Sequence, residues 1–569
     1  MSDSATEFHR SFRNNADDHL AEALGGLVAA HPDAEWHEEG FIAHATGRDA
    51  NRVAVLSGGG SGHEPLHAGF VGAGMLDAAV PGRLFTSPNA VQIAAATRWA
   101  DRGAGVLHVV KNYTGDIMNF AAARRACADT ATREVVVADD VATDSPDSDA
   151  TPEQNDGPGR RGTGATVLVE KIAGAAAARG DDLDTVAELA QRAADSSRSM
   201  AAALAPGHLP TTGRATFDLG PGEMELGVGI HGEPGRSRER AEDASSITAR
   251  LLSPVAKALS LDSGDEVYLL VNGLGGTSRL ELDLMYGQAV SWLDDHGVTV
   301  SRGIVGSLVT SVSMAGVSVT LMKASAEFTE LLDAPTGAPA WPHRIAGAPD
   351  AGAARGAGEY RPARLDSGIG QPGDGDAPAN EWLSAFIERV QGAVEPLGEL
   401  DRIAGDGDFG ANMSAAFGDL ELPLRGDDAT VLENLSRRMF VRAGGTSGAV
   451  LGTLFSQLAG ADGLAEGLRR GLTEVQALGG ARVGDRTLVD ALAPAADAAE
   501  TAETAETAEA LPEIFAAARD GATGTAGLAA RKGRASYIGT GTDGVLDPGA
   551  VVVAWLFGGT GQLSDFDAD

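Results

Sequence analysis

Two histidines lie next to glycine-rich segments, each after an apolar run. His231 lies in GVGIHGEPG (residues 227–235), and His63 lies in GGGSGHEP (residues 58–65). A neutral imidazole can attack a carbonyl carbon, and small glycine neighbours leave space around the ring. We therefore interpret His231 as a candidate nucleophile toward a carbonyl compound, although packing also explains a histidine at a strand end. The run before His231 alternates, which predicts a strand with one buried face; its apolar residues are Met224, Leu226, Val228 and Ile230.

A lysine, an amide and a carboxylate follow a second predicted strand. In HVVKNYTGD (residues 108–116), Lys111, Asn112 and Asp116 enter the loop at the carboxyl end of the strand. His63 follows the strand RVAVL in the same way, and open α/β sheets bind ligands at this edge. We expect these groups to face His63 across one cleft. For this segment alone, the alternative is a surface ion pair between Lys111 and Asp116.

An acidic turn occurs in the second half of the chain. Asp401, Asp406 and Asp408 lie in LDRIAGDGDFGANM (residues 400–413), and their oxygens on a tight turn suit Mg²⁺, which neutralises nucleotide phosphates. GGTSGAVLGTLF (residues 444–455) begins with a glycine turn and continues as an apolar helix, whose N-terminus favours a phosphate. Contact between helices through small residues explains this second segment equally well.

The elements that must position these groups differ between the two parts of the chain. In residues 1–335, short β-branched runs alternate with alanine-rich stretches, which predicts an α/β domain. Residues 380–569 have amphipathic helical periodicity and predict an all-α domain. Residues 336–379 are rich in Ala, Gly, Pro and Asp and are predicted to form a linker. Two acidic segments, residues 143–159 and 495–513, are predicted to be solvated insertions, the second as a surface helix or loop.

The composition limits the class of protein. The chain has 569 residues, 43% hydrophobic, and a formal net charge of −36. This charge repels nucleic acid phosphates and excludes a nucleic-acid-binding role, and its self-repulsion at low salt predicts a halophilic protein. A single cysteine (Cys127), a polar N-terminal segment and the lack of an apolar run of about 20 residues predict a cytoplasmic protein without a membrane span. Lys532 and Arg534 are candidates for phosphate contact in this cation-poor chain.

Ordered motifs along the chain resemble the dihydroxyacetone kinase family. GGGSGHEP, HVVKNYTGD, GEMELGVGIHGEPG and LLVNGLGGTS resemble its substrate-binding K domain. LDRIAGDGDFGANM, GGTSGAVLGTLF, GDRTLVDAL and DPGA resemble its nucleotide-binding L domain. The resemblance covers nearly the whole chain outside the linker and the acidic insertions. It implies a K domain of two α/β subdomains, an all-α helical-barrel L domain, and a homodimer formed through the K domain.

The resemblance also implies an activity. Fused K–L chains resemble the ATP-dependent form of the family, so the expected enzyme is a glycerone kinase that phosphorylates dihydroxyacetone. His231 would hold the ketone as a covalent hemiaminal, and His63 and Asp116 would act as acid and base. The substrate contacts that the resemblance implies are Gly60, Ser61, Gly62, His63, Lys111, Asp116 and His231.

The same resemblance implies a site for ATP and two Mg²⁺ ions. Asp401, Asp406 and Asp408 match the residues that chelate the ions. The residues implied to surround the nucleotide are Phe409, Gly410, Ala411, Asn412, Thr446, Ser447, Gly479, Leu488, Arg534, Asp547, Pro548 and Gly549.

Alternatives to a dihydroxyacetone kinase stay open. Related fused chains include kinases of other short ketoses, such as erythrulose, or of glyceraldehyde, and some also cyclise FAD. Other K and L chains are ligand-sensing co-regulators of transcription, whereas the intact His231 and acidic turn favour catalysis. Gly273 stands where relatives commonly have an asparagine, and Phe409 occupies a variable position. Both departures leave room for an altered substrate preference.

Overall fold

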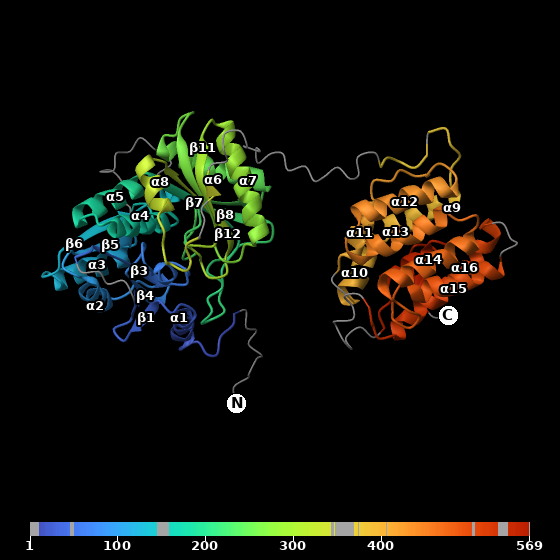
Figure 1. The fold of residues 1–569 in the computed structure, drawn as a ribbon, viewed down its shortest axis with the longest axis horizontal. Coiled ribbons are helices and arrows are strands. Elements are labelled where there is room, and N and C mark those ends of the chain that lie inside the picture. Colours follow the sequence, from blue (N-terminus) through green and yellow to red (C-terminus); the bar gives the residue numbers. More distant parts are fainter. Residues whose placement is uncertain are drawn as a thin grey trace. The chain divides into compact units, whose positions relative to one another are not determined.

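The computed structural model of the chain contains two compact units, residues 1–360 and residues 361–569 (Figure 1). Among the residues that the structure describes, no helix is both long and apolar enough to cross a bilayer. The described residues are 11–45, 51–144, 159–342, 346–347, 369–373, 375–404, 407–502, 507–532 and 544–567.

The first unit is built on two β-sheets. The strands of the first sheet are β1 (Ala34–His37), β2 (Phe41–His44), β3 (Ala54–Ser61), β4 (Ala78–Leu84), β5 (Val106–Lys111) and β6 (Thr132–Val137). Their order is β1-β2-β4-β3-β5-β6. Strands β4, β3, β5 and β6 are parallel, and β1 and β2 add an antiparallel edge. All residues of β3 and β5 are buried, as expected for parallel strands that are covered on both faces.

The second sheet is mixed. Its strands are β7 (Ser197–Ala205), β8 (Glu223–Leu226), β9 (Ser237–Arg240), β10 (Glu266–Gly273), β11 (Thr299–Gly306), β12 (Ala315–Lys323) and β13 (Ala346–Gly347). Their order is β13-β11-β10-β12-β7-β8-β9. Only β10 and β11 pair in parallel, and the other pairs are antiparallel.

Helices cover these sheets and fill the space between them. The helices of this unit are α1 (His19–Ala30), α2 (Ala90–Ala100), α3 (Thr114–Ala126), α4 (Ala165–Arg179), α5 (Leu183–Asp195), α6 (Ala244–Leu259), α7 (Arg279–Asp295) and α8 (Ala326–Asp333). Helices α2 and α3 pack against the first sheet, and α6 and α7 pack against the second. Helix α4 contacts both sheets, and its residues 165–177 are all buried. Polar side chains of α4 are therefore held in the interior of the unit.

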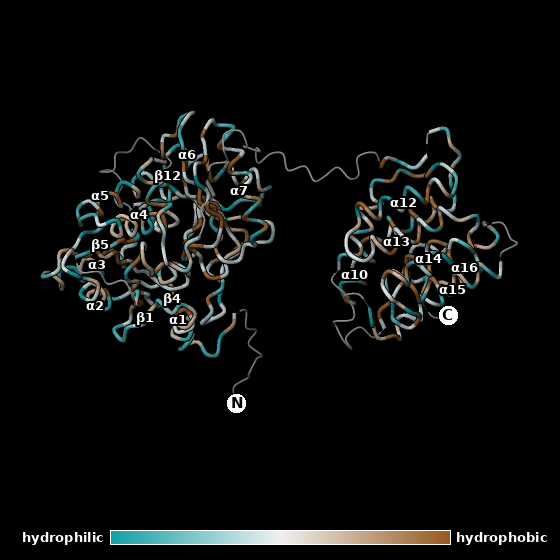
Figure 2. Tube along the Cα trace, viewed as in Figure 1, coloured by the Kyte–Doolittle hydropathy of each residue, from teal (hydrophilic) through white to brown (hydrophobic). Residues whose placement is uncertain are grey.

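The second unit is helical. Its helices are α9 (Glu381–Gly392), α10 (Val394–Ala404), α11 (Phe409–Phe417), α12 (Asp428–Arg442), α13 (Gly445–Ala459), α14 (Leu464–Gly479), α15 (Val489–Thr501), α16 (Thr507–Gly524) and α17 (Pro548–Trp555). They enclose one apolar core, and Figure 2 shows hydrophobic segments inside each unit and hydrophilic ones on its outer loops. An α/β unit with two sheets followed by a helical unit confirms the predicted fold class.

The strand before His231 is shorter than the alternation predicted. Strand β8 ends at Leu226, because the next residue, Gly227, has a left-handed φ of +82° and the chain turns there. Val228 and Ile230 are nevertheless buried, at 1% and 3% exposure. The continued alternation therefore reflects a buried loop.

Two further segments differ from their expected character. Residues 346–347, inside the predicted linker, pair with β11 as β13. The acidic segment 495–513 is not solvated throughout, because it contributes to α15 and α16 and its Ala495, Ala496 and Ala499 are at most 2% exposed. Residues 145–158 and 503–506 of the two acidic segments lie outside the described residues.

Candidate active site

His231 lies in the loop after β8, and Glu233 orients its ring. Nδ1 of His231 lies 2.8 Å from Oε1 of Glu233, and the backbone N–H of His231 donates to Oε2 at 2.9 Å. Burial raises the pKa of Glu233, but the hydrogen bond with the His231 ring is the largest of the effects that outweigh burial, and the pKa falls to about 2. The carboxylate therefore accepts the hydrogen of Nδ1. This assignment leaves the lone pair of Nε2 available to attack an electrophile.

His63 packs against His231. The two ring centroids are 4.7 Å apart with planes at 76°, and Phe85 stacks on His63 at 5.1 Å. Nδ1 of His63 lies 2.8 Å from the carbonyl oxygen of Thr310, so Nδ1 carries the hydrogen. Burial, with the nearby charges of His231 and Lys111, lowers the pKa of His63 well below its ordinary value. The ring is therefore neutral, and Nε2 of His63 is a hydrogen-bond acceptor.

Lys111 and Asp116 form a buried pair. Lys111 ends β5, Asp116 lies in the first turn of α3, and Nζ lies 3.8 Å from Oδ2 of Asp116. Their side chains are 1% and 4% exposed, which excludes the alternative of a surface ion pair. Asn112 instead donates from Nδ2 to the carbonyl oxygen of Arg160 at 2.7 Å and stabilises the loop.

Three buried polar atoms of these loops have no hydrogen-bond partner among the residues that the structure describes. They are Nε2 of His63, Oδ1 of Asp116 and Oη of Tyr113. The Tyr113 ring packs edge-on against His231, with centroids 4.7 Å apart. Burial of an unpaired polar atom costs about 1–3 kcal/mol, so such atoms are usually satisfied. A small carbonyl compound with hydroxyl groups would satisfy them and offer His231 an electrophilic carbon.

The predicted contacts Gly60, Ser61 and Gly62 precede His63 at the end of β3. Gly62 has φ of +102°, and a Cβ at this position would lie 2.7 Å from the Phe85 ring. The Ser61 hydroxyl donates to the carbonyl oxygen of Gly82 at 2.8 Å. A Cβ on Gly60 would lie 2.7 Å from the backbone nitrogen of Thr86. These contacts hold the turn against residues 82–86 and thereby set the position of His63.

Several residues around the two histidines were not predicted from the sequence. Glu233 could have been found, because a carboxylate two residues after His231 can reach back across the glycine turn. Phe85 and Thr310 lie on other loops, and Thr310 is 247 residues from His63, so no local pattern indicates them. Arg161 also contributes: it donates to the carbonyl oxygen of Gly227 at 2.7 Å and pairs with Asp140, which anchors the loop that carries His231.

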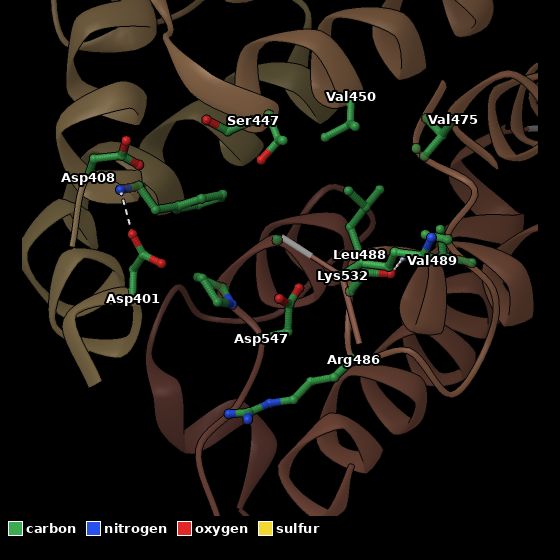
Figure 3. A pocket seen from close by; sticks show the side chains of 17 residues that line it. Asp401, Asp408, Ser447, Val450, Val475, Arg486, Leu488, Val489, Lys532 and Asp547 are labelled. Atoms are coloured by element: carbon green, nitrogen blue, oxygen red, sulfur yellow. Dashed lines mark hydrogen bonds between the residues drawn. The ribbon is translucent and has the colours of Figure 1, made fainter. Parts of the chain in front are cut away.

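A pocket of about 250 Å³ lies in the second unit (Figure 3). Asp401 and Asp408 lie at one end of it, and Val450 and Val475 lie on the opposite side. Of the residues predicted for the metal and the nucleotide, those that line this pocket are Asp401, Asp408, Phe409, Thr446, Ser447, Gly479, Leu488, Asp547, Pro548 and Gly549.

The acidic end of this pocket concentrates negative charge. Burial and the charge of Asp401 raise the pKa of Asp408. Burial, with contributions from Asp490 and Asp401, raises the pKa of Asp547 to about 7. A divalent cation would relieve this repulsion, and carboxylate oxygens are ligands that Mg²⁺ prefers. No three His, Cys, Asp or Glu side chains within the described ranges could hold a metal ion together, and Asp406 lies outside those ranges.

The start of α13 faces the same pocket. An apolar helix follows Gly444 as predicted, but it already begins at Gly445, so most of the predicted glycine turn (residues 444–448) is its first helical turn. Among the described residues no side chain caps its N-terminus, so its first N–H groups remain suited to an anion. Thr446 and Ser447 of this turn line the pocket. Asn412 connects the turn to α11: its Nδ2 donates to Oδ1 of Asp408 at 3.1 Å, and its Oδ1 accepts the N–H of Gly444 at 2.9 Å.

Other predicted nucleotide contacts lie elsewhere. Gly410, Ala411 and Asn412 belong to α11 but are not part of the pocket lining, and Arg534 lies outside the described residues. Arg486 was missed, although it lies in the quoted motif GDRTLVDAL; it is 2% exposed and donates to the carbonyl oxygen of Val545 at 2.6 Å. Lys532, which the sequence indicated as a candidate for phosphate contact, also lines the pocket. The other lining residues that were not assigned to the nucleotide are Val450, Val475, Ala481, Thr487 and Val489.

Comparisons with known proteins match both units. The Dak1 domain model matches residues 25–340, and the DAK2 domain model matches residues 403–562. Triokinase/FMN cyclase of Rattus norvegicus is 35% identical over 96% of this chain and 97% of its own. L-Erythrulose 1-kinase of Mycolicibacterium smegmatis is 34% identical over 96% of this chain and 98% of its own.

A solved structure matches over the same length. The dihydroxyacetone kinase of C. freundii is similar with a TM-score of 0.62 and 30% identity, over 97% of this chain and 99% of its own. The structure of that kinase in complex with AMP-PNP and Mg²⁺ matches with a TM-score of 0.61 over the same shares of both chains.

Proposed function

The chain belongs to the dihydroxyacetone kinase family, and on this premise we propose that it transfers the γ-phosphoryl group of ATP to a hydroxyl group of dihydroxyacetone. In its broader form the proposal is a kinase of small ketoses, since the similar proteins include a triokinase and an erythrulose kinase. The observation that carries it is the contact of the partly exposed His231 with the buried His63, where Glu233 leaves Nε2 of His231 with an available lone pair.

In the ketose site, His231 is proposed to form a hemiaminal with the substrate. A bond forms between Nε2 of His231 and the carbonyl carbon while the carbonyl π bond breaks, and the oxygen takes a proton from solvent. The ring gains positive charge in this step, and the Glu233 carboxylate at 2.8 Å from Nδ1 stabilises that charge. Nε2 of His63 accepts a hydrogen bond from a substrate hydroxyl. Asp116 is the base that takes the proton of the attacking hydroxyl.

The pocket of the second unit is proposed to bind ATP. Asp401 and Asp408, with Asp406, would hold Mg²⁺ (two ions in this proposal), and the metal supplies charge neutralisation on the triphosphate. The uncapped start of α13 at Thr446 and Ser447 would receive phosphate oxygens through its N–H groups. The apolar side would receive the base. We assign the ketose site to a domain of residues 1–335 and the nucleotide site to a domain of residues 380–569.

A substrate panel tests the function. Dihydroxyacetone, erythrulose, glyceraldehyde and glycerol are assayed with ATP and Mg²⁺ at low and at molar salt. We expect phosphorylation of dihydroxyacetone and none of glycerol, because glycerol has no carbonyl carbon for His231. Turnover of glycerol at a rate comparable to that of the ketoses, or no turnover of any carbonyl compound, would contradict the proposal. Binding of a ketose without turnover would instead support a ligand-sensing role.

A further inference from the structure

A chain of buried polar side chains leads from Lys111 into the interior of the first unit. Nζ of Lys111 lies 2.8 Å from Nε2 of His67, and Nδ1 of His67 lies 2.6 Å from Oε1 of Glu170 and 2.9 Å from the Ser57 hydroxyl. These four residues are between 0% and 5% exposed. Glu170 comes from α4, which lies between the two sheets, whereas Ser57 and Lys111 come from β3 and β5. Helix α4 on one side and strands of the first sheet on the other therefore hold this series of hydrogen-bonded side chains in place.

The hydrogens along this chain can be assigned from its two ends. An ammonium group only donates, so Nε2 of His67 accepts from Lys111. Nδ1 of His67 must then carry the ring hydrogen and donate to Glu170. The Ser57 hydroxyl donates to the carbonyl oxygen of Val109 at 2.8 Å, so its oxygen is also left to accept from Nδ1. His67 is thereby held in one tautomer.

This tautomer does not depend on the charge of Glu170. Burial raises the pKa of Glu170 to about 8, although the neighbouring Ser57 hydroxyl and the charge of Lys111 oppose this rise. Oε2 of Glu170 has no hydrogen-bond partner in the described part of the chain and can carry the proton. Oε1 accepts from His67 in both protonation states. Burial also lowers the pKa of His67 well below its ordinary value, so the ring stays neutral.

The backbone leaves room for these hydrogen-bonded side chains at Gly59, and the cavity beside them is too small for a ligand. A Cβ on Gly59 would lie 2.0 Å from Nζ of Lys111 and 3.0 Å from Nε2 of His67, so the contact requires glycine at this position. The cavity next to His67 has a volume of about 10 Å³, enough for one water molecule at most. These hydrogen-bonded side chains can therefore affect a ligand only through Lys111, the residue at the end nearest the ketose site.

We propose that His67 and Glu170 are positioning residues of the ketose site, which hold the ammonium of Lys111 beside Asp116. Oδ2 of Asp116 lies 3.8 Å from Nζ of Lys111, whereas its Oδ1 has no hydrogen-bond partner among the described residues. The ammonium at this distance attracts Oδ2 and fixes the orientation of the carboxylate, which leaves Oδ1 to accept a hydrogen bond from the substrate hydroxyl. The inference rests on the proposed role of Asp116 as the base.

Other titratable groups lie in electrostatic range of the same chain. Lys111 interacts with Asp116, Glu170 and His63, and His63 in turn interacts with His231. Of these groups only Glu170 is altered in the Glu170 variants proposed below, and Glu170→Gln is the control for the loss of its ionisable carboxyl. A shift of the pH profile in Glu170→Leu that is absent in Glu170→Gln can therefore be assigned to the loss of support for Lys111.

Two substitutions of Glu170 in the full-length chain test the proposal. Glu170→Gln keeps an acceptor for Nδ1 of His67, so we expect kcat within about twofold of the wild type and an unchanged pH profile. Glu170→Leu removes that acceptor, so kcat should fall about 10- to 100-fold while KM for ATP stays constant. The acid limb of kcat/KM for the ketose should move to higher pH by about one unit in Glu170→Leu, because the ammonium of Lys111 is no longer held beside the base.

A role in packing alone predicts a different result. A packing role would lower the melting temperature of Glu170→Leu without moving the acid limb of kcat/KM, and that outcome overturns the proposal. An equal loss of kcat in Glu170→Gln and Glu170→Leu also overturns it. If Glu170→Leu does not fold, His67→Leu replaces it: it removes the acceptor for Lys111, and an unmoved acid limb overturns the proposal. A wild type that phosphorylates no ketose overturns the proposed function itself. A wild type that is active, with an unmoved limb in the variants, refutes only the positioning role.

Discussion

At the residue scale, the hydrogen-bond partner of each histidine determines its chemistry. His231 and His63 both carry their hydrogen on Nδ1 and present Nε2. Their partners differ, because His231 donates to the carboxylate of Glu233 and His63 donates to the neutral carbonyl oxygen of Thr310. A carboxylate stabilises the positive charge that an imidazole gains when it bonds to carbon more strongly than a neutral carbonyl oxygen does. The nucleophile should therefore be His231, with His63 as an acceptor.

Removal of the His231 ring should separate ketose chemistry from nucleotide binding. In His231→Ala, we expect phosphorylation of dihydroxyacetone to fall about 1,000-fold or more, because neither neighbouring imidazole can replace the nucleophile. His63 has a carbonyl oxygen as its partner, and Nε2 of His67 is occupied by Lys111. ATP–Mg²⁺ affinity, measured by calorimetry, should not change. The matched variant Asp408→Asn should weaken ATP–Mg²⁺ binding and leave the ketose adduct detectable by mass spectrometry. Equal phosphorylation by His231→Ala and the wild type would refute the covalent role.

The buried carboxyl of Asp547 should make the stability of the nucleotide-free protein depend on pH. Its pKa in the folded chain is about 7, against an ordinary value of 3.8. The folded state therefore holds this proton more tightly than the unfolded state, and stability falls as pH rises from about 4 through about 7. Asp547→Asn keeps the acceptor for the N–H of Ala550 at the start of α17 but removes the charge.

Thermal unfolding without nucleotide measures this effect. The melting temperature of Asp547→Asn should exceed that of the wild type by more at about pH 8 than at about pH 5, because only the wild-type carboxyl ionises between them. ATP–Mg²⁺ should stabilise the variant less than the wild type. A difference between the two proteins that does not change with pH would contradict this assignment.

At the element scale, small residues allow α15 and α16 to pack closely. A Cβ on Gly521 would lie 2.2 Å from the carbonyl oxygen of Asp490 and 2.9 Å from Pro494, whereas a Cβ on Gly524 would meet no atom within 4 Å. Gly521→Ala should therefore lower the free energy of unfolding by about 1–3 kcal/mol through overpacking. Gly524→Ala, in the same helix, should be neutral or stabilising by up to about 1 kcal/mol. Hydrogen exchange of the amides in α15 and α16 measures both, and equal effects would contradict the packing argument.

Helices and strands with a distinctive pattern of apolar residues could be predicted from the sequence, whereas those with a weak or misleading pattern could not. Strands β3 and β5 are continuous apolar runs that end at glycine or polar residues, so both were identified. Strand β8 was predicted too long, because the buried loop after Leu226 alternates like a strand. The alanines of α15 bury little area each, so the acidic segment was expected to be solvated.

The candidate site was predictable only where reactive residue types lie beside glycines. His63, Lys111, Asp116 and His231 all stand in such segments, and the structure places them at loops of one unit. Glu170 could not have been assigned, because it lies in a helix that is buried along nearly its whole length, 103 residues from His67. Glu170 and His67 become neighbours only because α4 packs against the first sheet.

At the scale of the whole molecule, each unit has its own apolar clusters, and the chain carries a large excess of acidic residues. The helical unit has its own apolar cluster, and the α/β unit has others around its sheets. Each unit therefore buries its own apolar area, whereas repulsion between exposed carboxylates acts over both. With 80 acidic against 44 basic residues, that repulsion opposes the compact state wherever salt does not screen it.

Stability should therefore rise with salt in a way that identifies screening as the cause. The Debye length falls from about 10 Å at 0.1 M to about 3 Å at 1 M salt, so most of the gain in melting temperature should occur below about 1 M KCl. If the salt instead acted by exclusion from the protein surface, as sulfate does, the melting temperature would continue to rise at salt concentrations above about 1 M. Calorimetric scans across a KCl series, with sucrose as an uncharged control, distinguish the two causes. A melting temperature that is equal at low and at molar KCl would show that the net charge of −36 does not limit stability.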